Sequence, residues 1–183
     1  MQRTGLLVDG QILLYGDVGD PFGWGDGFTP TDVIQALAEH GPGDVTVRIN
    51  SGGGIAMDGM AIYSILKSHP GEVTVLIDGV AASAASLIAM GGDGIEMRDG
   101  AVMMIHDAAT ITFGDAGRHE KNRDFLDKLS DNYAGVYAAR SGLPREDVRA
   151  LMKAETWLTA DEAIEKGFAT AKINQAALQT AAF

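Results

Sequence analysis

The chain has 183 residues, 46% of them hydrophobic, and a formal net charge of −11 at pH 7. The acidic balance excludes nucleic-acid binding through basic patches, and the absence of cysteine excludes disulfides, a thiol nucleophile and a cysteine-based zinc site. No apolar run reaches the roughly 18 residues of a membrane span, and no signal-peptide core follows the N-terminus. We therefore expect one intracellular, cytoplasmic domain over residues 1–183, with a core at about 10–173 and a tail at 174–183.

The first half of the chain alternates predicted strands with predicted helices. Thr29 is placed to cap a helix that Pro30 begins and Gly41 ends. A loop rich in glycine and aspartate precedes it and carries Phe22, Trp24 and Phe28. The predicted strands are 11–15, 45–49 and 73–77, and the predicted helices are 30–40 and 56–68. This order predicts parallel βαβ units, whose sites lie in the turns after the strands.

The second half is predicted to hold two strands, a long helix and two shorter helices. The strands are 95–98 and 101–105, the helices are 118–141, 145–152 and 160–166, residues 155–158 form a linker and 168–173 is extended. Thr159 and Glu162 form a capping box for the last helix. The long helix is charged, with one apolar stripe of Phe125, Leu129, Tyr133 and Tyr137. Such a stripe packs on this domain or on a neighbouring subunit.

Ser83 lies at a predicted strand-to-helix junction among glycine and alanine residues. Small neighbours let a substrate approach closely, and the free N–H groups of a first helical turn point at whatever binds there. A hydroxyl beside such N–H groups suits acyl transfer, which needs a nucleophile and an oxyanion hole. The alternative is a tight packing joint between a strand and a helix.

The glycine run 52–54 also follows a predicted strand. It could cradle a phosphate, but neither Gly-Lys-Ser/Thr nor Gly-x-Gly-x-x-Gly is present. The other use is donation of a backbone N–H into the site around Ser83.

Among the histidines, His40 and His69 suit helix ends and His119 lies on an exposed helix, whereas His106 ends a predicted strand. His106 could serve as a base for Ser83 or as a buried structural residue. Asp107 adjoins it, but adjacent side chains on a strand point apart. Glu155 could turn inward and orient His106, or remain a solvated loop residue. The residues alone therefore do not decide whether Glu155 or Asp107 is the acid that orients His106.

The chain resembles the Clp protease proteolytic subunit (ClpP) family of serine peptidases. The matching stretches are Arg48 to Gly54, Gly79 to Ser83, Val102 to His106 and Trp157 to Ala163. The resemblance implies an α/β fold of the ClpP/crotonase type, built of repeated ββα turns with a protruding handle helix. It implies Ser83 as nucleophile, His106 as base, and Glu155 where the family usually has aspartate. Gly54 and Ala84 fall where the family supplies oxyanion-hole N–H groups.

The resemblance also implies partners. We expect a homo-oligomer of one ring or stacked rings, a polypeptide substrate, and neither metal nor organic cofactor. The N-terminal region lacks a match to the family's axial loops, and Gly52 and Asp107 depart from the family pattern, which argues against an ATPase unfoldase partner. The pattern from Glu155 to Ala160 is similar to the phage and prophage branch, which is associated with head maturation through cleavage of capsid or scaffold protein.

We therefore predict a serine endopeptidase that works through an acyl-enzyme. Two alternatives share the fold. A crotonase-like acyl-CoA enzyme would need a CoA-binding surface and would turn over thioesters. A non-catalytic ring or assembly protein would not react with an active-site serine probe.

Overall fold

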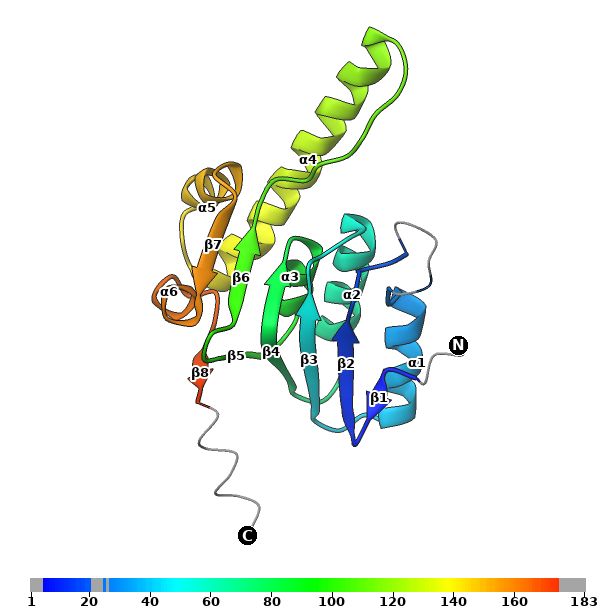
Figure 1. Cartoon of the computed structure of the whole chain (residues 1–183), viewed down its shortest axis with the longest axis vertical. Helices are drawn as coiled ribbons and strands as arrows, with labels where there is room; N and C mark the ends of the chain where they lie inside the picture. Colours follow the sequence, from blue (N-terminus) through cyan, green and yellow to red (C-terminus); the bar gives the residue numbers. More distant parts are fainter. Residues whose placement is uncertain (1–4, 21–24, 26, 175–183) are drawn as a thin grey trace.

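The computed structural model describes residues 5–20, 25 and 27–174. Its strands are β1 (Leu7–Val8), β2 (Gln11–Tyr15), β3 (Val45–Ser51), β4 (Val73–Ala82), β5 (Gly94–Arg98), β6 (Val102–Ile105), β7 (Thr156–Thr159) and β8 (Ala171–Ile173). Its helices are α1 (Pro30–His40), α2 (Ala56–Lys67), α3 (Ala84–Ala89), α4 (Ala116–Ser141), α5 (Arg145–Lys153) and α6 (Ala160–Glu165). The interleaved strands and helices form a mixed α/β fold, as predicted (Figure 1).

The strands form one sheet in the order β1-β2-β3-β4-β5-β8. The pairs from β2 to β5 are parallel, which confirms the βαβ prediction for the first half of the chain. Strand β4 pairs with two strands in succession, first with β5 and then, through Val80 to Ala82, with β6. The end of β4 therefore lies beside the end of β6, which brings the chain after Ala82 close to the chain after Ile105.

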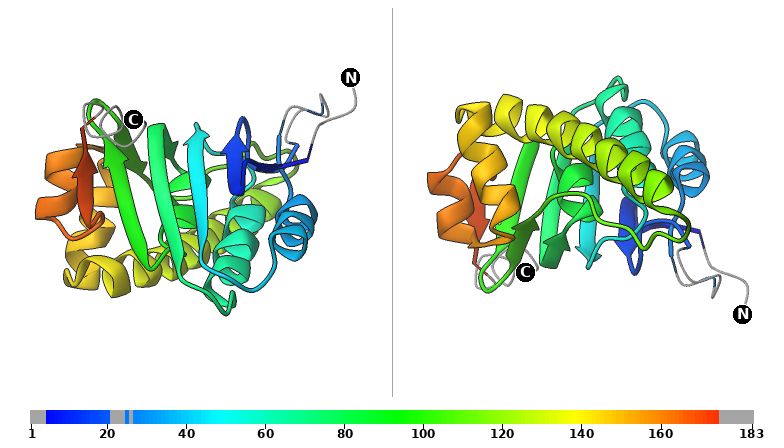
Figure 2. Two further views of the ribbon diagram at one scale, coloured as in Figure 1. Left: turned by 90° about the horizontal axis from the view of Figure 1, so that it is seen from below. Right: turned by 90° about the horizontal axis from the view of Figure 1, so that it is seen from above.

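The helices α1, α2 and α4 lie on the same side of the strands (Figure 2). Side chains that face this layer are fully buried along the central strands, among them Ile49, Val75 and Ile77. Short α3 is buried along its whole length, because alanine residues let it pack closely against α2 and the sheet. This packing fixes the start of α3, which is the strand-to-helix junction singled out in the sequence.

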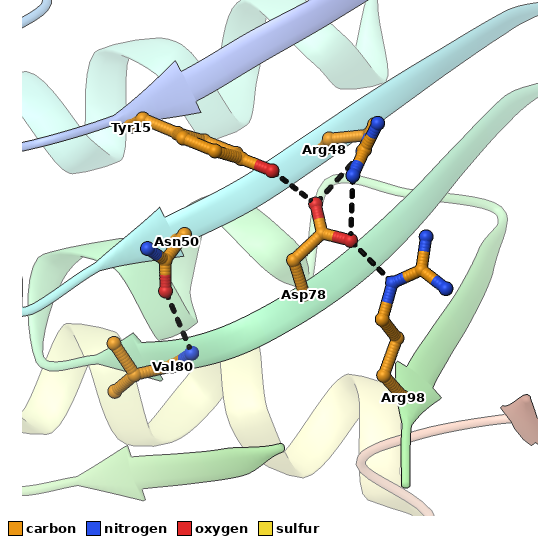
Figure 3. A network of polar contacts seen from close by, with 6 residues as sticks. All are labelled: Tyr15, Arg48, Asn50, Asp78, Val80 and Arg98. Atoms are coloured by element: carbon orange, nitrogen blue, oxygen red, sulfur yellow. Dashed lines mark hydrogen bonds and ion pairs between the residues drawn. The ribbon is translucent and has the colours of Figure 1, made fainter. Parts of the chain in front are cut away.

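On the other face of the sheet, one carboxylate connects four neighbouring strands (Figure 3). Asp78 accepts hydrogen bonds from Tyr15 on β2 at 2.6 Å, from Arg48 on β3 at 2.8 and 2.9 Å, and from Arg98 on β5 at 2.5 Å. Burial alone would raise the pKa of Asp78, but the hydrogen bonds from Arg48, Arg98 and Tyr15 outweigh it and lower that pKa. The ionised carboxylate thus holds the central strands together just before the site.

The ladder between β3 and β4 contains an irregularity at this point. Ile49 is paired with Ile77 and Ser51 with Ala81, so β4 carries extra residues between the two pairs. The Asn50 side chain accepts a hydrogen bond from the Val80 N–H at 3.2 Å, which replaces a ladder bond (Figure 3). The two strands consequently end side by side, with Ser83 after one and the glycine run after the other.

Helix α4 projects well beyond the rest of the chain, together with the extended segment that precedes it (Figure 1). We call residues 108–129 the arm. Two of its side chains, Ile111 and Phe113, are 83% and 82% exposed, and Phe125 is 47% exposed. The predicted stripe is therefore divided, because Tyr133 and Tyr137 are buried within this chain while Phe125 lies on the open arm.

Several predicted boundaries differ from the structure. Strand β4 runs to Ala82 rather than Ile77, and α4 begins at Ala116, where Asp115 caps it through the Arg118 N–H. The predicted linker at 155–158 is mostly strand β7, antiparallel to β6. Short β1 was not predicted, and the predictions for Phe22 and Trp24 lie outside the described residues.

Candidate active site

Ser83 lies between β4 and α3 in an unusual backbone conformation. Its φ is 54° and its ψ is −124°, a region that side-chain-bearing residues rarely occupy. The Ser83 N–H donates to the Met104 carbonyl at 3.0 Å, and the Ser83 carbonyl accepts the first hydrogen bonds of α3, from the Ser86 and Leu87 N–H groups. The turn presents the Ser83 side chain, which is half-buried, at the open end of the junction.

His106 meets Ser83 from the neighbouring strand. The distance from Ser83 Oγ to His106 Nε2 is 2.7 Å, which is a good hydrogen bond between a hydroxyl and an imidazole. In the tautomer with its proton on Nδ1, the ring accepts the hydroxyl proton. The two side chains meet because β4 and β6 lie side by side and both residues follow the last paired residues of these strands, Ala82 and Met104. The structure therefore brings together the predicted nucleophile and base.

The glycine run lies against the same turn. Gly53 has a φ of 103°, and a Cβ there would lie 2.7 Å from both the Ala82 carbonyl oxygen and Ser83 Cβ. Gly54 has a φ of 150°, and a Cβ there would lie 2.2 Å from the Val18 carbonyl oxygen. The buried Ser51 hydroxyl accepts the Gly53 N–H at 3.1 Å and fixes the loop. Glycine is required here because two backbones approach one another.

Two backbone N–H groups near Ser83 remain available. Within the described ranges, the N–H groups of Gly54 and Ala84 donate to no other residue. Ala84 is the first residue of α3, and Gly54 lines the same pocket as Ser83. N–H groups without a partner, beside a hydroxyl held by an imidazole, can bind the oxygen of a tetrahedral intermediate.

The two candidate acids have different surroundings in the structure. Asp107 forms an ion pair with Arg149 on α5, so its carboxylate is already engaged. Glu155 directly precedes β7, and one further step in the β6–β7 register would pair it with His106. Its side chain is exposed and its φ is 48°. Within the described part of the chain, its carboxylate forms no hydrogen bond or ion pair with His106 or with any other side chain. In the structure Glu155 thus lies one step beyond the last β6–β7 pair, without a hydrogen bond to the His106 ring.

A small pocket of about 180 Å³ adjoins Ser83. Its lining residues are Gly54, Ala56, Ser83, Ala84, Leu87, His106, Ala108, Ala109, Tyr133 and Tyr137. The Tyr133 hydroxyl is buried and has no hydrogen-bond partner among the described residues. A larger cleft of about 620 Å³ continues from Gly54 along the base of the arm, past Met57, Phe125 and Leu129. The pocket has room for one side chain, and the cleft for a longer segment.

The described ranges hold no cluster of three or more histidine, cysteine or acidic residues that could bind a metal. None of the helices in these ranges has the length and apolar character needed to cross a bilayer.

The sequence profile of the Clp protease family matches residues 29–176, which include the serine, the histidine and the glycine run. This chain belongs to the Clp protease family.

Individual relatives agree with the family profile. The chain is 28% identical to the ATP-dependent Clp protease proteolytic subunit 3 of Rhodococcus jostii, over 85% of this chain and 77% of the relative. It is 34% identical to the ATP-dependent Clp protease proteolytic subunit of Chaetosphaeridium globosum, over 68% of this chain and 63% of the relative.

Among solved structures, a ClpP1 mutant from Listeria monocytogenes superposes with a TM-score of 0.76, at 20% identity, over 90% of this chain and 91% of that one. The predicted ClpP-type fold is therefore confirmed, with α4 as the protruding helix. Family membership supports the function of a ClpP-type peptidase.

Sequence reasoning missed a contact between two residues next to the site. Ser86 and Tyr137 are both buried, and their hydroxyls are 2.7 Å apart. They lie 51 positions apart in the chain. The only signal in the sequence was the position of Tyr137 on the apolar stripe, where a polar end requires a partner.

Proposed function

We propose that this member of the Clp protease family is a serine endopeptidase that cleaves polypeptides through an acyl-enzyme. The observation that carries the proposal is the 2.7 Å contact between Ser83 Oγ and His106 Nε2. Beside it are two backbone N–H groups that have no partner among the described residues. A metal ion or organic cofactor has no part in this proposal.

In the first half of the reaction, Ser83 Oγ attacks the carbonyl carbon of the scissile peptide and its proton passes to His106 Nε2. The oxygen of the tetrahedral intermediate takes the negative charge and accepts hydrogen bonds from the Gly54 and Ala84 N–H groups. The C–N bond then breaks, and His106 gives its proton to the leaving amine. Water repeats the sequence on the ester and releases the acid, which regenerates Ser83.

Glu155 is the proposed third member of the site. Its role is to accept the His106 Nδ1–H and to stabilise the imidazolium that forms in the transition state. The role requires its side chain to turn from solvent toward the ring, and its place next to the Ile105–Thr156 pair supports this. The ion pair of Asp107 with Arg149 argues against Asp107 in this role.

We further propose that the chain works as a homo-oligomer, as one ring or as stacked rings. The arm supports this, because its exposed Ile111, Phe113 and Phe125 form apolar surface that another subunit could cover. Sedimentation at micromolar concentration tests the proposal. We expect a discrete oligomer that Phe113→Ser weakens, and a monomer at every concentration would contradict it.

The finer assignment is to capsid maturation in a phage, with a capsid or scaffold protein as substrate. It rests on the sequence pattern from Glu155 to Ala160 and on the departures that argue against an unfoldase partner. Under this proposal the chain works in the cytoplasm of the host cell.

A proteolysis assay tests the function against its two alternatives. We expect the unmodified chain to cleave an unfolded protein such as casein without ATP, and Ser83→Ala to be inactive. Turnover of an acyl-CoA thioester, with no peptide cleavage, would favour the crotonase-like alternative. Absence of both activities in the assembled protein would favour a non-catalytic assembly protein.

A further inference from the structure

Two buried hydroxyls connect α4 to the backbone of Ser83. Ser86 Oγ lies 2.7 Å from the Ser83 carbonyl oxygen and 2.7 Å from Tyr137 Oη. Ser86 is 0% exposed and Tyr137 is 1% exposed. A carbonyl can only accept, so the single hydroxyl hydrogen of Ser86 goes to Ser83 and Tyr137 must donate to Ser86. The hydrogen bonds therefore run in one direction, from Tyr137 through Ser86 to Ser83.

The Ser83 carbonyl belongs to the same planar peptide as the Ala84 N–H. Whatever fixes the direction of this carbonyl therefore also fixes the direction of that N–H, which points the opposite way. The Ser83 backbone is in a sparsely populated conformation, and such conformations persist only where the surroundings hold them. The Ser86 hydroxyl adds a third donor to this carbonyl, next to the amides of Ser86 and Leu87.

We infer that Ser86 and Tyr137 are positioning residues that aim the Ala84 N–H at the oxyanion of the tetrahedral intermediate. The inference rests on the proposed peptidase function, to which it adds a support for the oxyanion hole. Because Tyr137 belongs to α4, the same hydrogen bonds also link the helix of the arm to the site. The competing explanation is that Ser86 only gives the buried Tyr137 hydroxyl a partner.

A double substitution separates the two explanations. Ser86→Ala alone would leave the Tyr137 hydroxyl buried without a partner, and would therefore disturb folding whatever its role. Ser86→Ala combined with Tyr137→Phe removes both hydroxyls together, so neither is left buried without the other. The control makes the same two changes away from the site, Tyr63→Phe combined with Ser64→Ala on α2, where the exposed Ser64 hydroxyl donates to the Met60 carbonyl.

The measurements are kcat and KM on one peptide and the affinity for a peptide aldehyde. The aldehyde forms a hemiacetal with Ser83, and its oxygen occupies the oxyanion position. We expect the double variant to lose kcat about tenfold, a barrier change of about 1.36 kcal/mol. KM should stay within about twofold, and aldehyde affinity should fall by the same factor as kcat. Equal kcat and aldehyde affinity in the double variant and the control would overturn the inference.

Two further outcomes also have a definite meaning, a double variant that does not fold and an unmodified chain that is inactive. If the double variant fails to fold, Tyr137→Phe alone carries the test, since it keeps the ring that packs on Phe168 and keeps the bond from Ser86 to Ser83. The inference then requires a kcat lowered by about threefold, and an unchanged kcat overturns it. An unmodified chain without any peptidase activity would instead overturn the proposed function, which is a distinguishable result.

Discussion

The contact between the glycine run and the nucleophile gives a sharp prediction for Gly53→Ala. The new methyl group would lie 2.7 Å from Ser83 Cβ and 2.7 Å from the Ala82 carbonyl oxygen, closer than Cβ atoms approach in proteins. Both neighbours belong to the backbone of the junction or lie next to it, so neither can rotate away. The loop that carries the Gly54 N–H must therefore move away from Ser83.

The size of the effect follows from this displacement. Loss of one oxyanion donor costs about 10²- to 10³-fold in kcat, which is about 2.7–4 kcal/mol of transition-state stabilisation. In addition, a φ of 103° is strained for alanine, which should lower the free energy of unfolding by about 1–3 kcal/mol. We expect KM to change little, because the donor acts mainly on the transition state.

The assay is steady-state hydrolysis of one peptide, with Gly52→Ala as the control. A Cβ at Gly52 would have no heavy atom within 4 Å, and Gly52 has no positive φ. The control should retain kcat within about twofold, while urea unfolding verifies that both variants are folded. A Gly53→Ala enzyme with the same kcat as the control would refute the proposed use of this loop.

The remaining predictions concern the two acids and the carboxylate that connects the strands. Glu155→Gln should lower kcat by about 10²- to 10⁴-fold with little change in KM, whereas Asp107→Asn should cost much less; the reverse ranking on one peptide would make Asp107 the acid. Asp78→Asn should lower the free energy of unfolding by roughly 2–3 kcal/mol, less than for a fully buried pair because Arg48 is 28% exposed. The fold lowers the pKa of Asp78, so ionised Asp78 contributes fully to the free energy of unfolding above the ordinary pKa of 3.8. This contribution is lost as the pH falls through the lowered pKa. Urea unfolding at neutral and acid pH should show the loss of this contribution in the unmodified chain and not in Asp78→Asn.

The pairing of Ser83 with His106 could be anticipated in part, because both residues follow predicted strands and the family resemblance assigns them together. The parallel pairing of β4 with β6, which brings the two strand ends to one edge of the sheet, was not itself predicted. Strand β7 could not be anticipated in the same way. Its alternation is short, its Trp157 is 52% exposed, and antiparallel pairing with β6 depends on the tertiary fold.

Contacts between distant hydroxyls were also beyond sequence reasoning. Tyr137 was predicted as part of an apolar stripe, which is correct for its ring and incomplete for its hydroxyl. The division of that stripe into a buried half and the open arm depends on where α4 leaves the core, and helical periodicity carries no information about this. The side-chain direction of Glu155 likewise depends on a local backbone with φ of 48° that the sequence does not indicate.

The most direct test of the central claim is to map the adduct of a fluorophosphonate probe by mass spectrometry of the digested, assembled protein. The account predicts one phosphonylated residue, Ser83, and no labelling in His106→Ala, because the hydroxyl requires its base. Ser86 is the internal control, since it lies one helical turn away and is fully buried. An adduct on Ser86, or labelling that persists in Ser83→Ala, would contradict the assignment of the nucleophile.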